Sequence, residues 1–276
     1  MTRCHREDRR TSGGAMDRLY WHGNAAKTRV LADILTKIAD RPGAVVLDYG
    51  CGDGGDWPSI LADNPGLELI AYDPSSRRRA RASERLTELH ARIIDTDELL
   101  SDGASLRADF IVSFSVFEHV YDRYSYLRTA QRHLSDGGLF YLNYDDGHFR
   151  AALELDRLQD WPAQLRTVLH NRLARLLAQV GRVDLYQQRV PRLIADEMVN
   201  QCDFEIVDEF YSNLTCFKEL HKTLPNELHE EFSRLWIEVE ERLNRRFRVE
   251  GNFERGDTRN LWDVMPSRTL VLKLRT

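Results

Sequence analysis

A glycine-rich turn constrains this chain more than any other feature of its sequence. The apolar run 44–47 is short and continuous, as is typical of a parallel strand buried on both faces. It leads directly into residues 48–55, Asp-Tyr-Gly-Cys-Gly-Asp-Gly-Gly. Because glycine lacks Cβ, the backbone there can turn sharply and approach a ligand closely. The pattern predicts a strand–turn–helix unit with a cofactor lying across the turn.

Strands and helices alternate on both sides of this turn. Apolar runs predict further strands at 67–72, 90–95, 109–114, 138–143, 204–210 and 269–274. Helical periodicity predicts helices at 25–39, 57–63, 75–89, 124–134 and 193–201. Strands that alternate with helices form parallel sheets with right-handed crossovers. We therefore expect an α/β fold with a doubly wound, mostly parallel, seven-stranded sheet.

The remaining segments predict how the domain is organised. Residues 1–16 are polar with no apolar period, which predicts a flexible leader. Residues 17–276 are expected to form a single domain. Helical periodicity without strands predicts a helical cap insertion at about 150–192 and a second helical insertion at about 216–265.

Two aromatic features allow alternative interpretations. The Tyr-Trp-His cluster at 20–22 either closes over a cofactor or packs against the protein. The amphipathic segment 226–248 predicts the main helix of the second insertion. It is either a packed lid or a homodimer contact, in which Trp236 and Phe247 anchor the partner.

Composition excludes several classes of protein. A formal net charge of -5 disfavours a nucleic-acid partner, since such proteins usually carry a basic surface. No apolar run approaches the roughly 18 residues that span a bilayer, so we expect no membrane partner and a cytoplasmic location. The four cysteines form no C-x-x-C pair, which predicts neither a disulfide framework nor a metal site.

Charge around the turn bears on the identity of the cofactor. Gly50, Gly52 and Gly55 also satisfy the dinucleotide pattern G-x-G-x-x-G. However, three aspartates occur within 48–56, and no Lys or Arg occurs within 42–76. A diphosphate would meet carboxylates there, whereas S-adenosylmethionine carries a net positive charge. The loop therefore favours S-adenosylmethionine over NAD.

The same residues resemble a known family. Asp48, Gly50, Gly52 and Gly54 form D-x-G-x-G-x-G, which resembles motif I of class I S-adenosylmethionine-dependent methyltransferases. The resemblance covers residues 25–149 well and implies the Rossmann-like methyltransferase fold with helical insertions. It also implies a set of cofactor-binding residues: Asp48, Gly50, Cys51, Gly52, Gly54, Asp73, Pro74, Asp95, Thr96, Ser115 and Val116.

Within this set, two carboxylates have expected partners. Asp73 ends the second predicted strand, where both dinucleotide enzymes and class I methyltransferases place a carboxylate on the ribose hydroxyls. Asp95 and Thr96 follow the third predicted strand, at the position that the resemblance assigns to the adenine amino group. Asp97 is the alternative there.

Two histidines are candidate general bases. His119 follows the fourth predicted strand in Glu-His-Val, and His148 follows the fifth. Imidazole titrates near neutral pH and could take the proton of the methyl acceptor. The alternatives are that His119 is structural and that the loop around His148 is merely polar. The neighbouring Asp145 and Asp146 could instead bind a hard divalent cation, although no metal is expected.

These observations predict methyl transfer to an oxygen or nitrogen of a small metabolite, possibly in natural-product biosynthesis. Most of the rate gain would come from holding the reacting atoms in line, because the sulfonium methyl group is already activated. Three alternatives stay open: an NAD-dependent oxidoreductase, an RNA or protein methyltransferase, and a cofactor-binding protein without catalysis.

Overall fold

The structure is a computed structural model of the chain. It describes residues 21, 23–39, 41, 43–101, 106–145, 173, 188, 190–249 and 264–275. The expected leader at 1–16, most of the expected cap at 150–192 and His148 lie outside the described residues.

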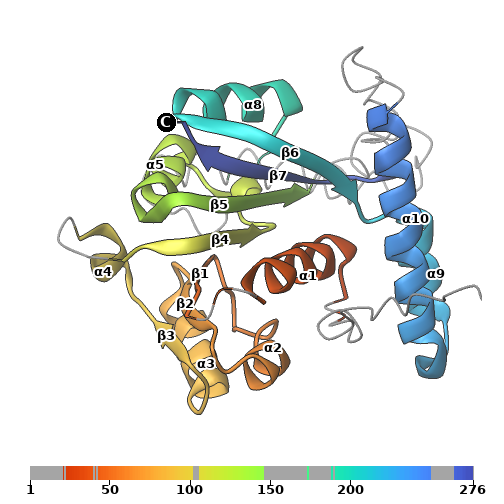
Figure 1. Cartoon of the computed structure of the whole chain (residues 1–276), viewed down its shortest axis with the longest axis horizontal. Helices are drawn as coiled ribbons and strands as arrows, with labels where there is room; N and C mark the ends of the chain where they lie inside the picture. Colours follow the sequence, from red (N-terminus) through yellow and green to blue (C-terminus); the bar gives the residue numbers. More distant parts are fainter. Residues whose placement is uncertain are drawn as a thin grey trace, which may run out of the picture.

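A seven-stranded sheet in the order β3-β2-β1-β4-β5-β7-β6 forms the centre of the molecule (Figure 1). Its strands are β1 (Val45–Tyr49), β2 (Glu68–Tyr72), β3 (Ala91–Ile93), β4 (Ala108–Phe114), β5 (Leu134–Asp145), β6 (Phe204–Ser212) and β7 (Ser267–Leu274). The first five strands pair in parallel, and β7 pairs antiparallel with both β5 and β6. The expected doubly wound, mostly parallel sheet is therefore confirmed.

Helices cover both faces of this sheet (Figure 1). One apolar cluster joins one face to α1 (Ala25–Ile38), α2 (Pro58–Asp63) and α3 (Ser76–Leu86). The other cluster joins the opposite face to α4 (Thr96–Leu100), α5 (Arg123–His133) and α8 (Arg192–Gln201). Such coverage explains why β1 and β4 read as apolar runs without polar alternation.

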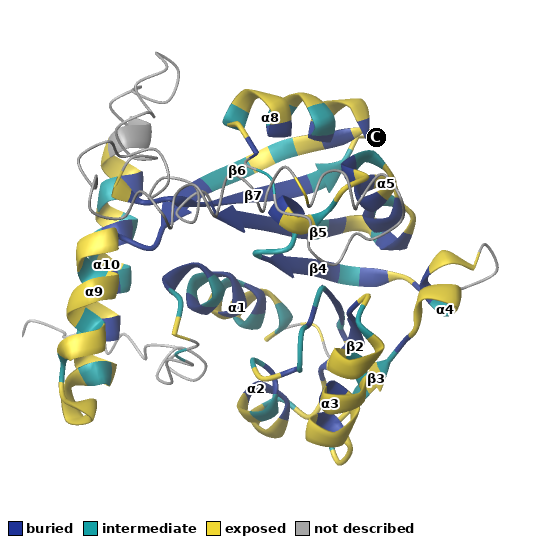
Figure 2. Cartoon of the chain, turned by 180° about the vertical axis from the view of Figure 1, so that it is seen from behind, coloured by how far each residue is buried: buried dark blue, intermediate teal, exposed yellow. Residues whose placement is uncertain are grey.

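The segment between β6 and β7 is helical where it is described. It contains α9 (Thr215–Thr223), the short 3₁₀ helix η3 (Asn226–Leu228) and α10 (His229–Val249). In Figures 1 and 2 these helices stand at the edge toward which β4 and β5 point. Residues 250–263 of the expected second insertion lie outside the described residues.

The buried stripe of α10 is partly polar, although Trp236, Val239 and Leu243 of its predicted apolar face do pack inward. Glu240 and Asn244 are buried, whereas Leu235 is 50% exposed. The Glu240 carboxylate accepts from the Leu214 N–H at 2.7 Å, and Asn244 accepts from the Tyr211 N–H at 2.8 Å. The helix turns this stripe inward because it satisfies backbone groups at the end of β6.

Trp236 belongs to the same buried stripe, which corrects its proposed role as a dimer anchor. Its side chain is 1% exposed, so it offers no surface to a partner. Its ring lies 5.3 Å from that of Trp21 and 6.2 Å from that of Phe217. Of the aromatic cluster at 20–22, only Trp21 is described, and it packs against this insertion.

The pairing of β6 with β7 contains a register shift of one residue. Phe204 and Ile206 pair with Leu274 and Leu272, but Asp208 pairs with Val271. Val207 is therefore an extra residue in β6, as in a β-bulge. Beyond the shift the ladder is regular and ends with Ser212 opposite Ser267.

Candidate active site

The glycine turn adopts backbone conformations that side-chain-bearing residues rarely take. Gly50, Gly52 and Gly54 have φ values of 113°, 58° and 72°. The N–H groups of Gly50 and Cys51 donate to the Tyr72 carbonyl oxygen at 2.8 and 2.9 Å. These bonds tie the end of β1 to the end of β2, so both ends meet at one edge of the sheet.

The three glycines serve different purposes. A Cβ on Gly50 would lie 2.3 Å from the Val116 side chain, so this position lets β1 and the exit of β4 approach. A Cβ on Gly54 would lie 3.0 Å from Leu86, so Gly54 permits packing on α3. A Cβ on Gly52 would meet nothing within 4 Å. Gly52 therefore faces open space, as a backbone that contacts a ligand must.

Asp48 lies beneath the turn and is only 3% exposed. The Trp57 indole N–H donates to its carboxylate at 2.6 Å. Burial raises the pKa of Asp48 to about 7, and the Asp56 and Asp73 carboxylates act in the same direction. Asp48 is therefore only partly ionised near neutral pH, and Trp57 is its hydrogen-bond donor.

Cations from neighbouring helices offset the acidity of the turn, which corrects the charge argument made from the sequence. Lys27 Nζ of α1 lies 2.7 Å from Asp56, and Arg85 Nη1 of α3 lies 2.9 Å from Asp53. Segment 42–76 itself contains no basic residue, but basic residues from α1 and α3 lie beside it in the fold. The local charge alone therefore does not select S-adenosylmethionine.

Asp73 lies at the end of β2, as expected, with its carboxylate facing the turn. One oxygen accepts from the Gly52 N–H at 3.1 Å and the other from the Ser75 N–H at 2.9 Å. Arg79 Nη1 donates to the carbonyl oxygens of Asp73 and Pro74 at 2.7 and 3.2 Å. Each carboxylate oxygen retains a further lone pair, so Asp73 can still accept from two hydroxyl groups.

The next strand end carries the two residues expected near adenine. Asp95 is the N-cap of α4 and accepts from the Glu98 N–H at 2.9 Å. The Thr96 hydroxyl lies 3.2 Å from the Tyr72 hydroxyl, which places it beside the end of β2. The structure brings both residues to the cofactor edge of the sheet, and their contact with adenine stays a prediction.

The exit of β4 joins the glycine turn to the end of β5. Ser115 has a φ of 53°, and its N–H donates to the Asn143 carbonyl oxygen at 3.1 Å. The Val116 side chain packs against Gly50, where it leaves no room for a Cβ atom. The 3₁₀ helix η1 (Phe117–His119) follows directly.

Of the two candidate bases, only His119 is described. Its side chain is exposed at the end of η1. Its role in proton transfer stays a prediction, as does that of His148.

The sequence analysis overlooked Glu118 as a candidate base. Glu118 has 0% exposure, and neither carboxylate oxygen has a hydrogen-bond partner among the described residues. Burial raises its pKa to about 8, the nearby Asp145 carboxylate adds to the rise, and the N–H groups of Glu118 and Asp145 offset part of it. These N–H groups influence the carboxylate without reaching hydrogen-bond geometry. Only the fold reveals this burial, because the sequence shows an ordinary Glu beside a His.

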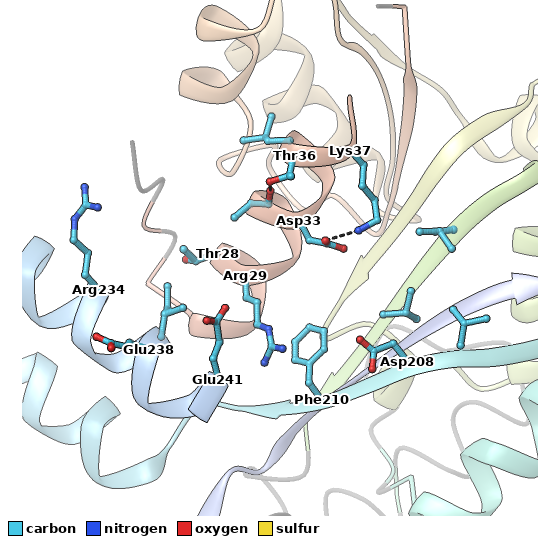
Figure 3. A pocket seen from close by; sticks show the side chains of 16 residues that line it. Thr28, Arg29, Asp33, Thr36, Lys37, Asp208, Phe210, Arg234, Glu238 and Glu241 are labelled. Atoms are coloured by element: carbon cyan, nitrogen blue, oxygen red, sulfur yellow. Dashed lines mark hydrogen bonds and ion pairs between the residues drawn. The ribbon is translucent and has the colours of Figure 1, made fainter. Parts of the chain in front are cut away.

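A cavity of about 670 Å³ lies elsewhere, between α1, α10 and the β5–β7–β6 part of the sheet (Figure 3). The Arg29 guanidinium stacks on the Phe210 ring at 3.9 Å, and Asp33 pairs with Lys37 on its wall. None of the predicted site residues lines it. It is therefore separate from the turn.

Metal and membrane features can be assessed only for the described part of the chain. Within it, no group of three or more His, Cys, Asp or Glu side chains could hold a metal ion. The alternative of a cation at Asp145 and Asp146 is untested, because Asp146 is not described. No described helix combines the length and apolar character needed to cross a bilayer.

Comparison with known families identifies the class of protein. The family model described as "Methyltransferase domain" matches residues 20–181, which is more than half of the chain. The chain belongs to this family, and S-adenosylmethionine is its methyl donor. The resemblance drawn from the glycine turn is thereby confirmed for family, fold and cofactor.

Individual relatives show diverse activities. The chain is 33% identical over 134 residues to the cyclopropane-fatty-acyl-phospholipid synthase of Escherichia coli K12, covering 45% of this chain and 33% of the relative. It is 30% identical over 108 residues to the ubiquinone biosynthesis O-methyltransferase of Caulobacter vibrioides, covering 36% of this chain and 40% of that protein. The chain thus spans well under half of the length of these two relatives.

A solved structure supports the fold. A putative sarcosine dimethylglycine methyltransferase from Galdieria sulphuraria superposes with a TM-score of 0.51 at 13% identity. The superposition covers 89% of this chain and 84% of the other. At this identity the likeness concerns the fold and not the substrate.

Proposed function

We propose that this protein transfers a methyl group from S-adenosylmethionine to an oxygen or nitrogen of a small metabolite. The observation that carries the proposal is the open face of Gly52 beside the Asp73 carboxylate, since together they can accommodate an adenosyl group. Asp73 would accept hydrogen bonds from the ribose hydroxyls.

S-adenosylmethionine supplies a methyl group already activated on sulfonium, so the S–C bond breaks as the bond to the acceptor atom forms. The protein's task is to position the acceptor and exclude water. The exit of β4 is suited to this task because the contact between Gly50 and Val116 brings it to the turn. Glu118, two residues beyond Val116, is a buried carboxyl at the same exit of β4.

A small metabolite is favoured over a macromolecule by charge. The net charge of -5 disfavours an RNA partner, and the described helices α9 and α10, at the edge toward which β4 and β5 point (Figure 1), are suited to enclosing a small acceptor. A natural-product acceptor, cytoplasmic location and a homodimer stay predictions.

Calorimetry with S-adenosylhomocysteine tests the proposal. We expect micromolar binding to the wild type and roughly hundredfold weaker binding to Asp73→Ala, since charge-assisted hydrogen bonds contribute about 1.5–3 kcal/mol each. Asp136→Ala, at an exposed position near the start of β5, is the matched control and should bind normally. Tight NADH binding together with no binding of either adenosyl ligand would refute the proposal.

A further inference from the structure

Lys27 of α1 brings a positive charge to the edge of the sheet where the glycine turn lies. The Ala25 N–H donates at 3.1 Å to Oδ1 of Asn213, which follows β6, and β6 runs in the same direction as β5. The helix α1 therefore begins at the carboxyl edge. Lys27 Nζ lies 2.7 Å from Asp56, at the end of the turn, and 5.7 Å from the ring centre of Phe114, the last residue of β4. One ammonium group thus contacts both the turn and the end of β4.

The ammonium group of Lys27 is able to bind a further anion. It has three N–H donors, and Asp56 is its one hydrogen-bond acceptor among the described residues. The Lys27 and Asp56 side chains are 26% and 21% exposed, so the pair is partly open to solvent. The backbone N–H groups of Ala26 and Lys27, by contrast, are already bonded to Oδ1 of Asn24, the N-cap of α1. The available donors therefore belong to the Lys27 side chain and not to the start of the helix.

The other described cations that contact the aspartates at the turn all belong to α3. Arg85 Nη1 lies 2.9 Å from Asp53, and Arg78 Nη1 lies 3.7 Å from the Asp73 carboxylate. Arg79 donates to the Asp73 carbonyl oxygen at 2.7 Å. Because α3 connects β2 with β3, these arginines lie on the β2 side of the turn. Lys27, which contacts the end of β4, lies on the opposite side.

The order of the strands gives the bound methyl donor a direction. The proposed function places the ribose at Asp73, after β2, and the adenine is expected at Asp95 and Thr96, after β3. In the order β3-β2-β1-β4, the rest of the donor then extends from β2 toward β1 and β4. This rest consists of the sulfonium and the amino-acid part that is attached to it. The amino-acid part is therefore expected on the side of the turn that Lys27 occupies.

The amino-acid part contains the one negative group of the donor, its carboxylate. Asp48 and Asp56 carry negative charge at the same place, so they would repel this carboxylate. A cation with available N–H donors compensates for the repulsion and forms charge-assisted hydrogen bonds. Lys27 fits this requirement by its charge, its donors and its position. The arginines of α3 fit it by charge alone, since they lie beside the ribose.

We propose that Lys27 binds the carboxylate of the methyl donor and makes the protein selective for adenosyl ligands that carry this group. The inference rests on the proposed function for the position of the adenosine, and it adds a specificity-determining residue. Lys27 transfers no proton in this role. Because the sulfonium is joined to the amino-acid part, a held carboxylate also restricts the direction in which the methyl group points.

Three adenosyl ligands can test this inference by calorimetry on the full chain. S-adenosylhomocysteine contains the adenosine, an ammonium group and a carboxylate. Its decarboxylated analogue lacks only the carboxylate, and methylthioadenosine lacks both charged groups. The aspartates at the turn would favour the analogue, which has a net positive charge, so a preference for S-adenosylhomocysteine requires a cation at its carboxylate. We expect the wild type to bind S-adenosylhomocysteine about tenfold more tightly than the analogue.

Single variants locate the source of this preference. Lys27→Met should reduce it to within about twofold, whereas affinity for methylthioadenosine should stay within about twofold of the wild type. The second measurement reports that the fold and the adenosine site are intact. Lys27→Arg keeps the charge and should retain most of the preference. Lys37→Met is the matched control, because Lys37 belongs to the same helix and pairs with Asp33 away from the turn. It should behave like the wild type.

A double variant separates direct contact from net charge. Lys27→Met alone makes the turn more negative, which would also weaken binding of a carboxylate. Lys27→Met combined with Asp56→Asn removes one charge of each sign and so restores the net charge of the wild type. We expect the preference to stay lost in the double variant, because the contact is missing. If Lys27→Met does not fold, the double variant and the ligand comparison on the wild type decide the question.

Three results would overturn the inference. They are a wild type that binds the analogue as tightly as S-adenosylhomocysteine, a preference that survives in Lys27→Met, and a preference that returns in the double variant. The last would mean that only the net charge of the turn matters. A wild type that binds neither S-adenosylhomocysteine nor methylthioadenosine would instead refute the proposed function, so the two failures are distinguishable.

Discussion

The glycine turn and the exit of β4, with Glu118, lie at the same edge of the sheet but differ in how their polar groups are satisfied. At the turn, Asp48 accepts from an indole N–H, and Asp73 accepts from two backbone N–H groups. At the exit of β4, neither carboxylate oxygen of the buried Glu118 has a hydrogen-bond partner among the described residues. One region is complete within the protein, whereas the other lacks hydrogen-bond donors.

This difference separates two ways of recognising a ligand. A turn with satisfied carboxylates is rigid and selects by shape, since the ligand must fit the open face of Gly52. An unsatisfied buried acceptor such as the Glu118 carboxylate selects by chemistry, because only a donor-bearing group removes its cost.

The largest effect is expected from filling the turn with Gly50→Ala. The added Cβ would lie 2.3 Å from Val116 at a φ of 113°, so overpacking and backbone strain should together cost about 2–5 kcal/mol of unfolding free energy. Binding of S-adenosylhomocysteine should fall with it. Thermal unfolding and calorimetry would measure both.

Two variants separate the causes of that loss. Gly50→Ala combined with Val116→Ala removes the clash and should recover part of the stability but not the part due to strain. Gly66→Ala adds a Cβ in open space and should change stability by less than about 1 kcal/mol. A Gly50→Ala protein as stable as the wild type would show that the turn is not rigid.

An intermediate effect is expected from Glu118 when pH changes. The pKa of Glu118 rises from 4.5 to about 8 on folding, so the folded chain binds more protons than the unfolded chain between these values. The free energy of unfolding should therefore fall as pH rises through this range. Glu118→Gln should reduce this slope by up to about 1 kcal/mol per pH unit.

Chemical denaturation at pH 5 to 9 would measure this slope. Asp48 and Glu240, whose pKa values rise to about 7, give slopes of the same sign that should persist in the variant. Glu205→Gln changes an exposed carboxylate and should leave the wild-type slope intact. An unchanged slope in Glu118→Gln would mean that Glu118 is solvated.

The smallest effect is expected from Arg85→Ala at the turn. The Arg85 and Asp53 side chains are 43% and 46% exposed, so water screens their ion pair. Its loss should change the free energy of unfolding by less than about 0.5 kcal/mol and leave cofactor affinity within twofold. A tenfold loss of affinity on calorimetry would show that the cations around the turn also hold it in place.

Local patterns made most of the fold predictable. The apolar run at 44–47 and the glycines after it locate β1 and the turn, because a buried parallel strand needs continuous apolar residues. The short helix α4 went unpredicted, since five residues give too little periodicity. The polar stripe of α10 was also missed, because its partners lie in β6 and not in the helix itself.

The site was less predictable than the fold, because its electrostatics depend on contacts distant in sequence. Lys27 and Arg85 approach the turn from α1 and α3, which no local window shows. The pKa of Glu118 is raised by burial and by Asp145 at the end of β5, which lies twenty-seven residues further along the chain. In the Glu-His-Val segment the sequence predicted His119 as the candidate base, because imidazole titrates near neutral pH. The side chain of His119 is exposed.

The extra residue Val207 in β6 determines which side chain stands opposite Ser267. If pairing continued from Phe204 without the register shift, Tyr211 would stand opposite Ser267 in place of Ser212. A phenol ring would then stand where the hydroxymethyl group of Ser212 is buried. A single inserted residue, far from any binding motif, thus determines how bulky the side chains are at this end of β6.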